Sequence, residues 1–153
     1  MNDYDLIKAQ ISALIETDPH YIPVLSNAAS ILFQSMENAS WAGFYLLKDG
    51  RLVVGPFQGK PACIHIEKGK GVCGTAWEKA ETIIVPDVEE FPGHIACSSL
   101  SRSEIVVPLF SGGEVIGVLD IDREELDTFD GVDALWLERI AGHSEKILKG
   151  KYR

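Results

Sequence analysis

Residues 104–121, EIVVPLFSGGEVIGVLDI, contain the pattern that decides the fold. Two apolar runs, Glu104 to Phe110 and Val115 to Ile121, flank the short segment Ser111-Gly112-Gly113-Glu114. Paired glycines between β-branched runs are typical of a hairpin, because glycine adopts the left-handed backbone conformations of tight turns. We therefore expect two antiparallel strands in this part of the chain.

A second hairpin is expected further upstream. The segments Trp41 to Leu47 and Leu52 to Phe57 are apolar and aromatic, and Asp49-Gly50 lies between them. An Asp-Gly pair in this position is a strong hairpin signal. Cys63 to Ile66 and Ile83 to Val85 are further strand candidates. Because hairpins join antiparallel strands, the sequence predicts a largely antiparallel sheet.

Helices are expected at both ends of the chain. The apolar residues of 6–15 recur at helical spacing, and Asp18-Pro19 resembles the N-cap and first-turn proline of a second helix. Residues 72–79 fit a short helix, and Thr128 or Asp130 is expected to cap the last one. The order of elements predicts an α+β fold in which a central antiparallel sheet is flanked by N- and C-terminal helices.

The composition fits one globular domain that spans residues 1–153. The net charge of −9 disfavours nucleic acid and membrane surfaces as partners, since both attract positive charge. The acidic N-terminus predicts no signal peptide, and no apolar run approaches the roughly 20 residues that span a bilayer. We therefore expect a cytoplasmic protein, and the sequence leaves open whether it is a monomer or a homodimer.

The three cysteines, Cys63, Cys73 and Cys97, are the first candidates for chemistry. An odd count without a CxxC pair argues against a disulfide framework and against structural zinc. Cys97 lies among small and polar residues, where His94 and Arg102 could favour the reactive thiolate. For each cysteine the alternative is simple burial as a small apolar side chain.

Carboxylates form the second group of candidates. Asp120 and Asp122 are two positions apart in an expected strand, so their side chains point to the same face. The partner strand of the hairpin could bring Glu104 beside them. Three acids on one face either meet water or line a pocket for an ammonium group or a hard metal ion. Trp41 could close such a pocket over a methyl group or a cation.

Five segments, in this order and with this cysteine spacing, resemble the free methionine-(R)-sulfoxide reductase family. They are GPFQG at 55–59, GKGVCG at 69–74, FPGHIAC at 91–97, SRSEIV at 101–106 and GVLDID at 117–122. The resemblance implies a GAF domain that reduces free methionine-(R)-sulfoxide with thiols. We expect no cofactor and no metal.

The resemblance also implies roles for individual residues. By this resemblance Cys97 is the catalytic cysteine, Cys73 is the leading candidate to resolve it, and Cys63 is auxiliary. The expected reductant is thioredoxin or a similar dithiol. The implied substrate-binding residues are the aromatic pair Trp41 and Tyr45 and the acids Glu104, Asp120 and Asp122.

The chemistry of these residue types agrees with the resemblance. Carboxylates select the ammonium group of a free amino acid, and a thiolate attacks the electrophilic sulfur of a sulfoxide. An acid kept protonated by like-charged neighbours could donate a hydrogen bond to the sulfoxide oxygen, and the thiol would become a sulfenic acid and then a disulfide. Two alternatives stay open. One is a non-catalytic GAF module that senses a small molecule, and the other is a thiol redox sensor without a substrate.

Overall fold

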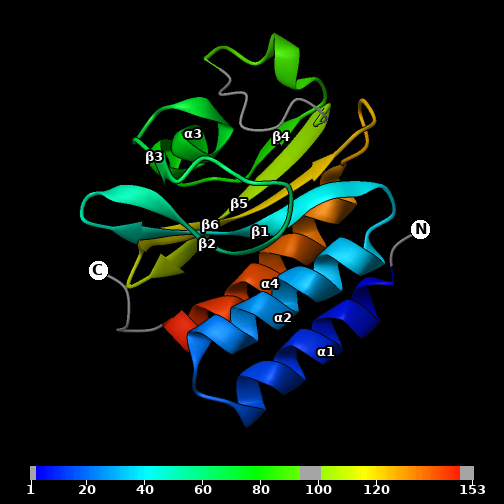
Figure 1. The fold of residues 1–153 in the computed structure, drawn as a ribbon, viewed down its shortest axis with the longest axis vertical. Helices are drawn as coiled ribbons and strands as arrows, with labels where there is room; N and C mark the ends of the chain where they lie inside the picture. The colour runs from blue at the N-terminus through cyan, green and yellow to red at the C-terminus, as the bar shows by residue number, and fades with distance from the viewer. Residues whose placement is uncertain (1–2, 94–100, 149–153) are drawn as a thin grey trace.

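The computed structural model describes residues 3–93 and 101–148. One six-stranded antiparallel sheet, in the order β3-β2-β1-β6-β5-β4, separates two layers (Figure 1). The helices are α1 (Tyr4–Thr17), α2 (Tyr21–Ser35), α3 (Gly71–Lys79) and α4 (Gly131–Leu148). The strands are β1 (Ala39–Lys48), β2 (Arg51–Gly59), β3 (His65–Ile66), β4 (Ile83–Val85), β5 (Ser103–Ser111) and β6 (Glu114–Arg123), with a 3-10 turn η1 (Val88–Glu90). The expected α+β fold is confirmed.

Three helices cover one face of the sheet. Helices α2 and α4 pack on the strands, and α1 packs on α2 and α4 (Figure 1). The short helix α3 packs on β5 and β6 from the other face. The expected flanking of the sheet by N- and C-terminal helices is therefore observed, and the opposite face is left to α3 and the connections around it.

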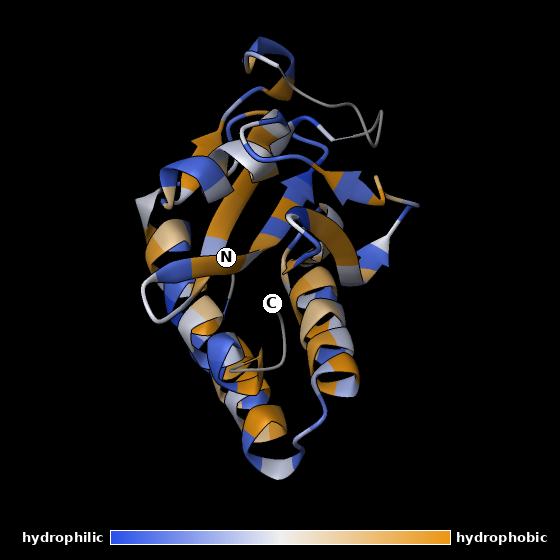
Figure 2. Cartoon of the chain, turned by 90° about the vertical axis from the view of Figure 1, so that its left-hand side faces the viewer, coloured by the Kyte–Doolittle hydropathy of each residue, from blue (hydrophilic) through white to orange (hydrophobic). Residues whose placement is uncertain are grey.

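Side chains that point alternately to the two faces of the central strands form two hydrophobic cores. On β6, Leu119 and Ile121 join the core under the helices, whereas Val118 joins a smaller core under α3. Figure 2 shows hydrophobic residues along the sheet strands and alternating with hydrophilic ones around the helices. Because successive residues point to opposite faces, the residues between those of the helix-side core belong to the α3 side. This second face carries the acids discussed below, and we call it the site face.

Both expected hairpins are present. β1 pairs with β2, and β5 pairs with β6. Asp49 and Gly50 both have positive φ, at 53° and 79°, as a two-residue turn of the primed type requires. The pairing of β1 with β6 then joins the two hairpins into one sheet.

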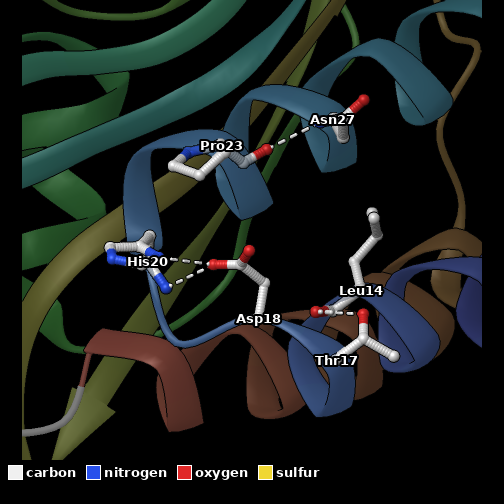
Figure 3. A network of polar contacts seen from close by, with 6 residues as sticks. All are labelled: Leu14, Thr17, Asp18, His20, Pro23 and Asn27. Carbon is white, nitrogen blue, oxygen red and sulfur yellow. Dashed lines mark hydrogen bonds and ion pairs between the residues drawn. The ribbon is translucent and has the colours of Figure 1, made fainter.

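The start of α2 differs from the expectation. His20 occupies the N-cap position, and Asp18 lies in the connection before it. Asp18 Oδ1 accepts hydrogen bonds from the backbone N and from Nδ1 of His20, both at 2.8 Å (Figure 3). The Asp18 side chain therefore folds the turn between α1 and α2, and the proline in the first turn of α2 is Pro23.

The boundaries of β3 and α4 can also be compared with the sequence-based expectations. Strand β3 contains only His65 and Ile66, so the expected strand from Cys63 is shorter than predicted. Asp130 caps α4, because its Oδ1 accepts hydrogen bonds from the backbone N of Val132 and of Asp133, both at 3.0 Å. Within residues 3–93 and 101–148, none of the helices combines the length and apolar character required to cross a bilayer.

Candidate functional site

A cavity of about 50 Å³ lies on the site face, between the first turn of α3 and the strands β1, β5 and β6. Cys97 lies outside the described residues, and Cys63 does not line this cavity. The other predicted site residues all line it: Trp41, Tyr45, Cys73, Glu104, Asp120 and Asp122.

The strand register explains why the three acids meet. Asp120 and Asp122 are two residues apart on β6, so they share the site face, as their spacing predicts. Glu104 on β5 is directly opposite Asp122 in the antiparallel pairing. Three carboxyl groups from two neighbouring strands therefore gather over one small area of the sheet.

These acids are largely removed from water. Glu104 is 8% exposed and Asp120 is 5% exposed, while Asp122 is half-buried as a residue. Among the described residues, neither Asp120 Oδ1 nor Asp122 Oδ1 has a hydrogen-bond partner, although both atoms are buried. Buried acceptors without donors are costly, so the site is poised to take up a cation or a donor group.

Burial and mutual repulsion favour protonation of the cluster. Burial raises the pKa of Asp120, and the neighbouring charges of Asp122 and Glu104 raise it further. Burial also raises the pKa of Asp122, with the charge of Glu104 as the second cause. The cluster therefore keeps a proton to higher pH than an exposed carboxylate does.

Ser101 distinguishes the two aspartates. Its Oγ donates a hydrogen bond to Asp122 Oδ2 at 3.3 Å and lies 3.2 Å from Ser40 Oγ. This donation lowers the pKa of Asp122 against the raising effect of burial. Asp120 receives no such hydroxyl donation from the described residues, so Asp120 is the better proton holder of the pair. Ser101 is not among the predicted site residues, although its place in the SRSEIV segment was the available signal.

An aromatic wall borders the acids. The Trp41 ring stacks on Tyr45 at 5.7 Å and on Phe57 at 5.1 Å between ring centroids. Trp41 Nε1 donates a hydrogen bond to the carbonyl of Lys60 at 3.2 Å, which fixes the indole. Burial raises the pKa of Tyr45, and the charge of Asp120 adds to this, so Tyr45 remains a phenol.

The cysteines occupy different environments. Cys73 is 4% exposed and carries a free thiol, whereas Cys63 is half-buried and disulfide-bonded. Burial raises the pKa of Cys73, and the charges of Asp120 and Glu104 raise it further. A thiol in such surroundings is a poor nucleophile, because the thiolate is the attacking form.

The first turn of α3 completes the pocket. Gly71, Val72 and Cys73 open this helix and line the cavity. The first N–H groups of a helix have no partner within the helix and form its partially positive end. The pocket thus lies between carboxyl groups on the sheet and the partially positive start of a helix, which suits a molecule that carries both charges.

The fold and this pocket define the chain as a GAF-domain protein, and the sequence model of the GAF domain matches residues 24–149. The free methionine-R-sulfoxide reductase of Escherichia coli is 41% identical over 145 residues, which cover 95% of this chain and 88% of that protein. The reduced fRMsr of Staphylococcus aureus superimposes with a TM-score of 0.92 at 49% identity, covering 97% of this chain and 96% of that chain.

A third relative is the free methionine-R-sulfoxide reductase of Neisseria meningitidis in complex with its substrate. It superimposes with a TM-score of 0.91 at 48% identity, covering 94% of this chain and 87% of that chain. The chain belongs to the free methionine-R-sulfoxide reductase family of GAF domains. The resemblance found in its sequence motifs is thereby confirmed.

Proposed function

We propose that this chain is an oxidoreductase that reduces free L-methionine-(R)-S-oxide to L-methionine. The observation that carries the proposal is the buried group of Glu104, Asp120 and Asp122 beside the Trp41 ring, in a chain of this family. The chemistry of the pocket matches the three parts of the substrate, which are an ammonium group, a carboxylate and a methyl sulfoxide.

The acids favour a free amino acid over a methionine residue within a protein. An ammonium group beside Glu104 and Asp122 would satisfy the buried Oδ1 atom of Asp122, which has no described donor. A peptide-bound methionine sulfoxide has a neutral amide at this position, so the acids would stay without a counter-charge. The substrate carboxylate would face the N–H groups at the start of α3, and the methyl end would lie against Trp41.

The first chemical step is an attack of the Cys97 sulfur on the sulfoxide sulfur. Asp120, which holds a proton, donates it to the sulfoxide oxygen and polarises the S–O bond. The oxygen ends on Cys97 as a sulfenic acid, and the two-electron reduction releases methionine. Cys97 is therefore oxidised as the substrate sulfur is reduced.

In the second step another thiol condenses with the sulfenic acid, forms a disulfide and releases water. We assign this role to Cys63, which is disulfide-bonded in the structure, while Cys73 has a free and acid-surrounded thiol. This assignment differs from the sequence-based expectation that Cys73 resolves the intermediate. We prefer Cys63 because Cys73 is the cysteine with a free thiol. A dithiol reductant of the thioredoxin type then restores both thiols.

Such a cycle needs a reducing compartment that supplies dithiols, so we propose the cytoplasm as the site of action. Light scattering on the purified protein distinguishes a homodimer from a monomer.

The test uses purified protein, dithiothreitol and each epimer of free methionine sulfoxide, with methionine measured by chromatography. We expect methionine from the R epimer alone and no product with Cys97→Ser. N-acetylmethionine sulfoxide is the matched control, because it keeps the sulfoxide and lacks the ammonium group. Folded, reduced protein that forms no methionine from either epimer would overturn the proposal.

A single-turnover experiment tests the two resolving candidates. One equivalent of substrate is added to fully reduced protein, and sulfenic acid is trapped with dimedone and measured by mass spectrometry. Cys63→Ser should accumulate the trapped adduct, whereas Cys73→Ser should still form the disulfide. The reverse pattern would return the role to Cys73.

A further inference from the structure

We propose that Cys73, Glu104 and Asp120 form a binding site for a thiophilic divalent cation, with Zn²⁺ as the best fit. A consequence, which rests on the function proposed above, is that this ion inhibits the enzyme by competing with the substrate ammonium group. The site itself stands on geometry alone and does not depend on the reaction.

The three ligand atoms are already close together. The Cys73 Sγ and one carboxylate oxygen each of Glu104 and Asp120 all lie within 4.8 Å of one another. Zinc binds sulfur at about 2.3 Å and carboxylate oxygen at about 2.0–2.2 Å, so ligand atoms around it are roughly 3.5 Å apart. Rotation of the two carboxyl groups provides the remaining approach of about 1 Å.

The unpartnered atom of Asp120 is an independent sign that the site can take a ligand. Its Oδ1 is buried without a hydrogen-bond partner among the described residues, in a side chain that is 5% exposed. A bound cation would satisfy this acceptor. The adjoining cavity of about 50 Å³ leaves room for a water molecule as the fourth ligand of a tetrahedral ion.

The donor set selects the kind of ion. One sulfur and two carboxylate oxygens suit zinc or cadmium, which accept both donors. Magnesium and calcium prefer six or more oxygen ligands and gain little from a thiol. The ligands come from α3, β5 and β6, which are packed elements of the fold, so the backbone positions of the three residues are set before an ion arrives.

The site is separate from the disulfide. Cys73 carries a free thiol while Cys63 is disulfide-bonded, so an ion could bind in the oxidised as well as in the reduced protein. Zinc on Glu104 and Asp120 would occupy an acid that the substrate ammonium needs and the acid that holds the proton. Inhibition should therefore be relieved by high substrate concentration rather than by a stronger thiol reductant alone.

The binding test uses the Cys63→Ser/Cys97→Ser variant, in which Cys73 is the only thiol. Titration with Co²⁺ should give a thiolate-to-cobalt charge-transfer band in the near ultraviolet and intense visible bands of a tetrahedral site, at one ion per chain. Zn²⁺ should displace the cobalt. The further variant Asp120→Asn should weaken the cobalt affinity by about tenfold or more.

Adding Cys73→Ser provides the matched control, with circular dichroism to show that each variant is folded. Calorimetry on this thiol-free protein should show loss of binding. No cobalt band in the folded Cys73-only variant would overturn the site, and so would a binding isotherm that is unchanged after Cys73→Ser. An affinity that is unaffected by Asp120→Asn would also count against it.

The inhibition test uses reduced, desalted wild-type protein in single turnovers, because dithiothreitol chelates zinc. Zn²⁺ should slow methionine formation at low substrate and have little effect at saturating substrate. A loss of rate that substrate does not relieve would overturn the competition. If metal-free protein forms no methionine, the proposed function fails, while the cobalt spectrum still decides the site.

Discussion

Asp120 is a residue whose burial lowers the stability of the fold and supports the proposed chemistry. It lies in the middle of a strand, buried, with Val118 and Ile121 as apolar neighbours on the same strand. A carboxyl group there must either hold a proton or carry an uncompensated charge, and both states cost free energy in the substrate-free protein. A sulfoxide oxygen that accepts a hydrogen bond from the protonated carboxyl group would offset that cost, so the group that weakens the fold would favour substrate binding.

The first prediction is that Asp120→Asn stabilises the protein and removes its activity. The pKa of Asp120 is raised from its ordinary value of 3.8, so the folded state keeps a proton that the unfolded chain releases. Stability is therefore full below about pH 4 and falls as pH rises toward the raised pKa. Asparagine has nothing to titrate, and each pKa unit removed is worth about 1.4 kcal/mol.

Thermal unfolding from pH 4 to pH 8 measures this effect. The wild-type Tm should fall more steeply with rising pH than that of Asp120→Asn, and the two should converge near pH 4. At pH 7 we expect the variant to melt about 2–4 °C higher for each kcal/mol gained. Its rate of methionine formation should fall by about 100-fold or more, because the proton donor is lost. A variant that melts lower at pH 7 and higher at pH 4 would contradict the sign of the effect.

At the scale of elements, the strands β1 and β2 approach each other closely at Gly43. Gly43 is paired with Phe57, and the register shifts between Gly43 and Tyr45. A Cβ atom at Gly43 would lie 2.7 Å from Phe57 Cα and 2.9 Å from the carbonyl oxygen of Pro56, both of which are backbone atoms. The absent side chain therefore lets the strands meet where Trp41 and Tyr45 form the aromatic wall.

The second prediction is that Gly43→Ala destabilises the protein by about 2–3 kcal/mol, because the strands must separate to admit the methyl group. Chemical denaturation measures the change. Gly142→Ala is the matched control, since a Cβ there meets nothing within 4 Å and the residue lies inside α4. The control should gain up to about 1 kcal/mol from helix propensity. Equal effects of the two substitutions would refute the packing argument.

The cap of α4 supports a third prediction at the same scale. Asp130→Ala removes the acceptor of two backbone N–H groups and should cost about 1 kcal/mol in free energy of unfolding. Asp130→Asn keeps a side-chain acceptor and should cost much less. Denaturation midpoints of the two variants provide the measurement. Indistinguishable midpoints would show that the cap contributes nothing to stability.

Elements were predictable where their signals are local. The Asp49-Gly50 pair and the alternation in 104–121 need no knowledge of distant residues, and both hairpins formed as expected. The predicted start of α2 was wrong, because an aspartate before a proline can either cap a helix or form a turn. Both conformations are local, so the sequence leaves the choice open, and in the structure Asp18 accepts hydrogen bonds from His20 and forms the turn.

The site was predictable in part. Period-two spacing placed Asp120 and Asp122 on one face, because a strand has no other geometry. The hydrogen bond of Ser101 to Asp122 and the stacking of Phe57 on Trp41 join residues far apart in the chain, so no spacing rule reveals them. No spacing rule shows either that Cys63 is disulfide-bonded while Cys73 is a buried free thiol.

At the scale of the whole molecule, one sheet supplies both cores. Val118 and Leu119 are adjacent on β6, yet they pack on opposite faces, one under α3 and the other under the helices. Neither core can be lost without disturbing strands that the other core requires. The molecule should therefore behave as one cooperative unit, in spite of having two separate hydrophobic clusters.

The fourth prediction is that both faces unfold together. The chain has three tryptophans, of which Trp41 reports on the site face and Trp136, stacked on Tyr4 at 6.0 Å, reports on the helix side. Trp77→Phe/Trp136→Phe leaves Trp41 alone, and Trp41→Phe/Trp77→Phe leaves Trp136 alone. Fluorescence of each variant during urea denaturation should give the same midpoint as its own far-ultraviolet circular dichroism. A Trp41 signal lost at lower urea than the circular dichroism would mean that the site face opens separately and that the protein does not unfold as one cooperative unit.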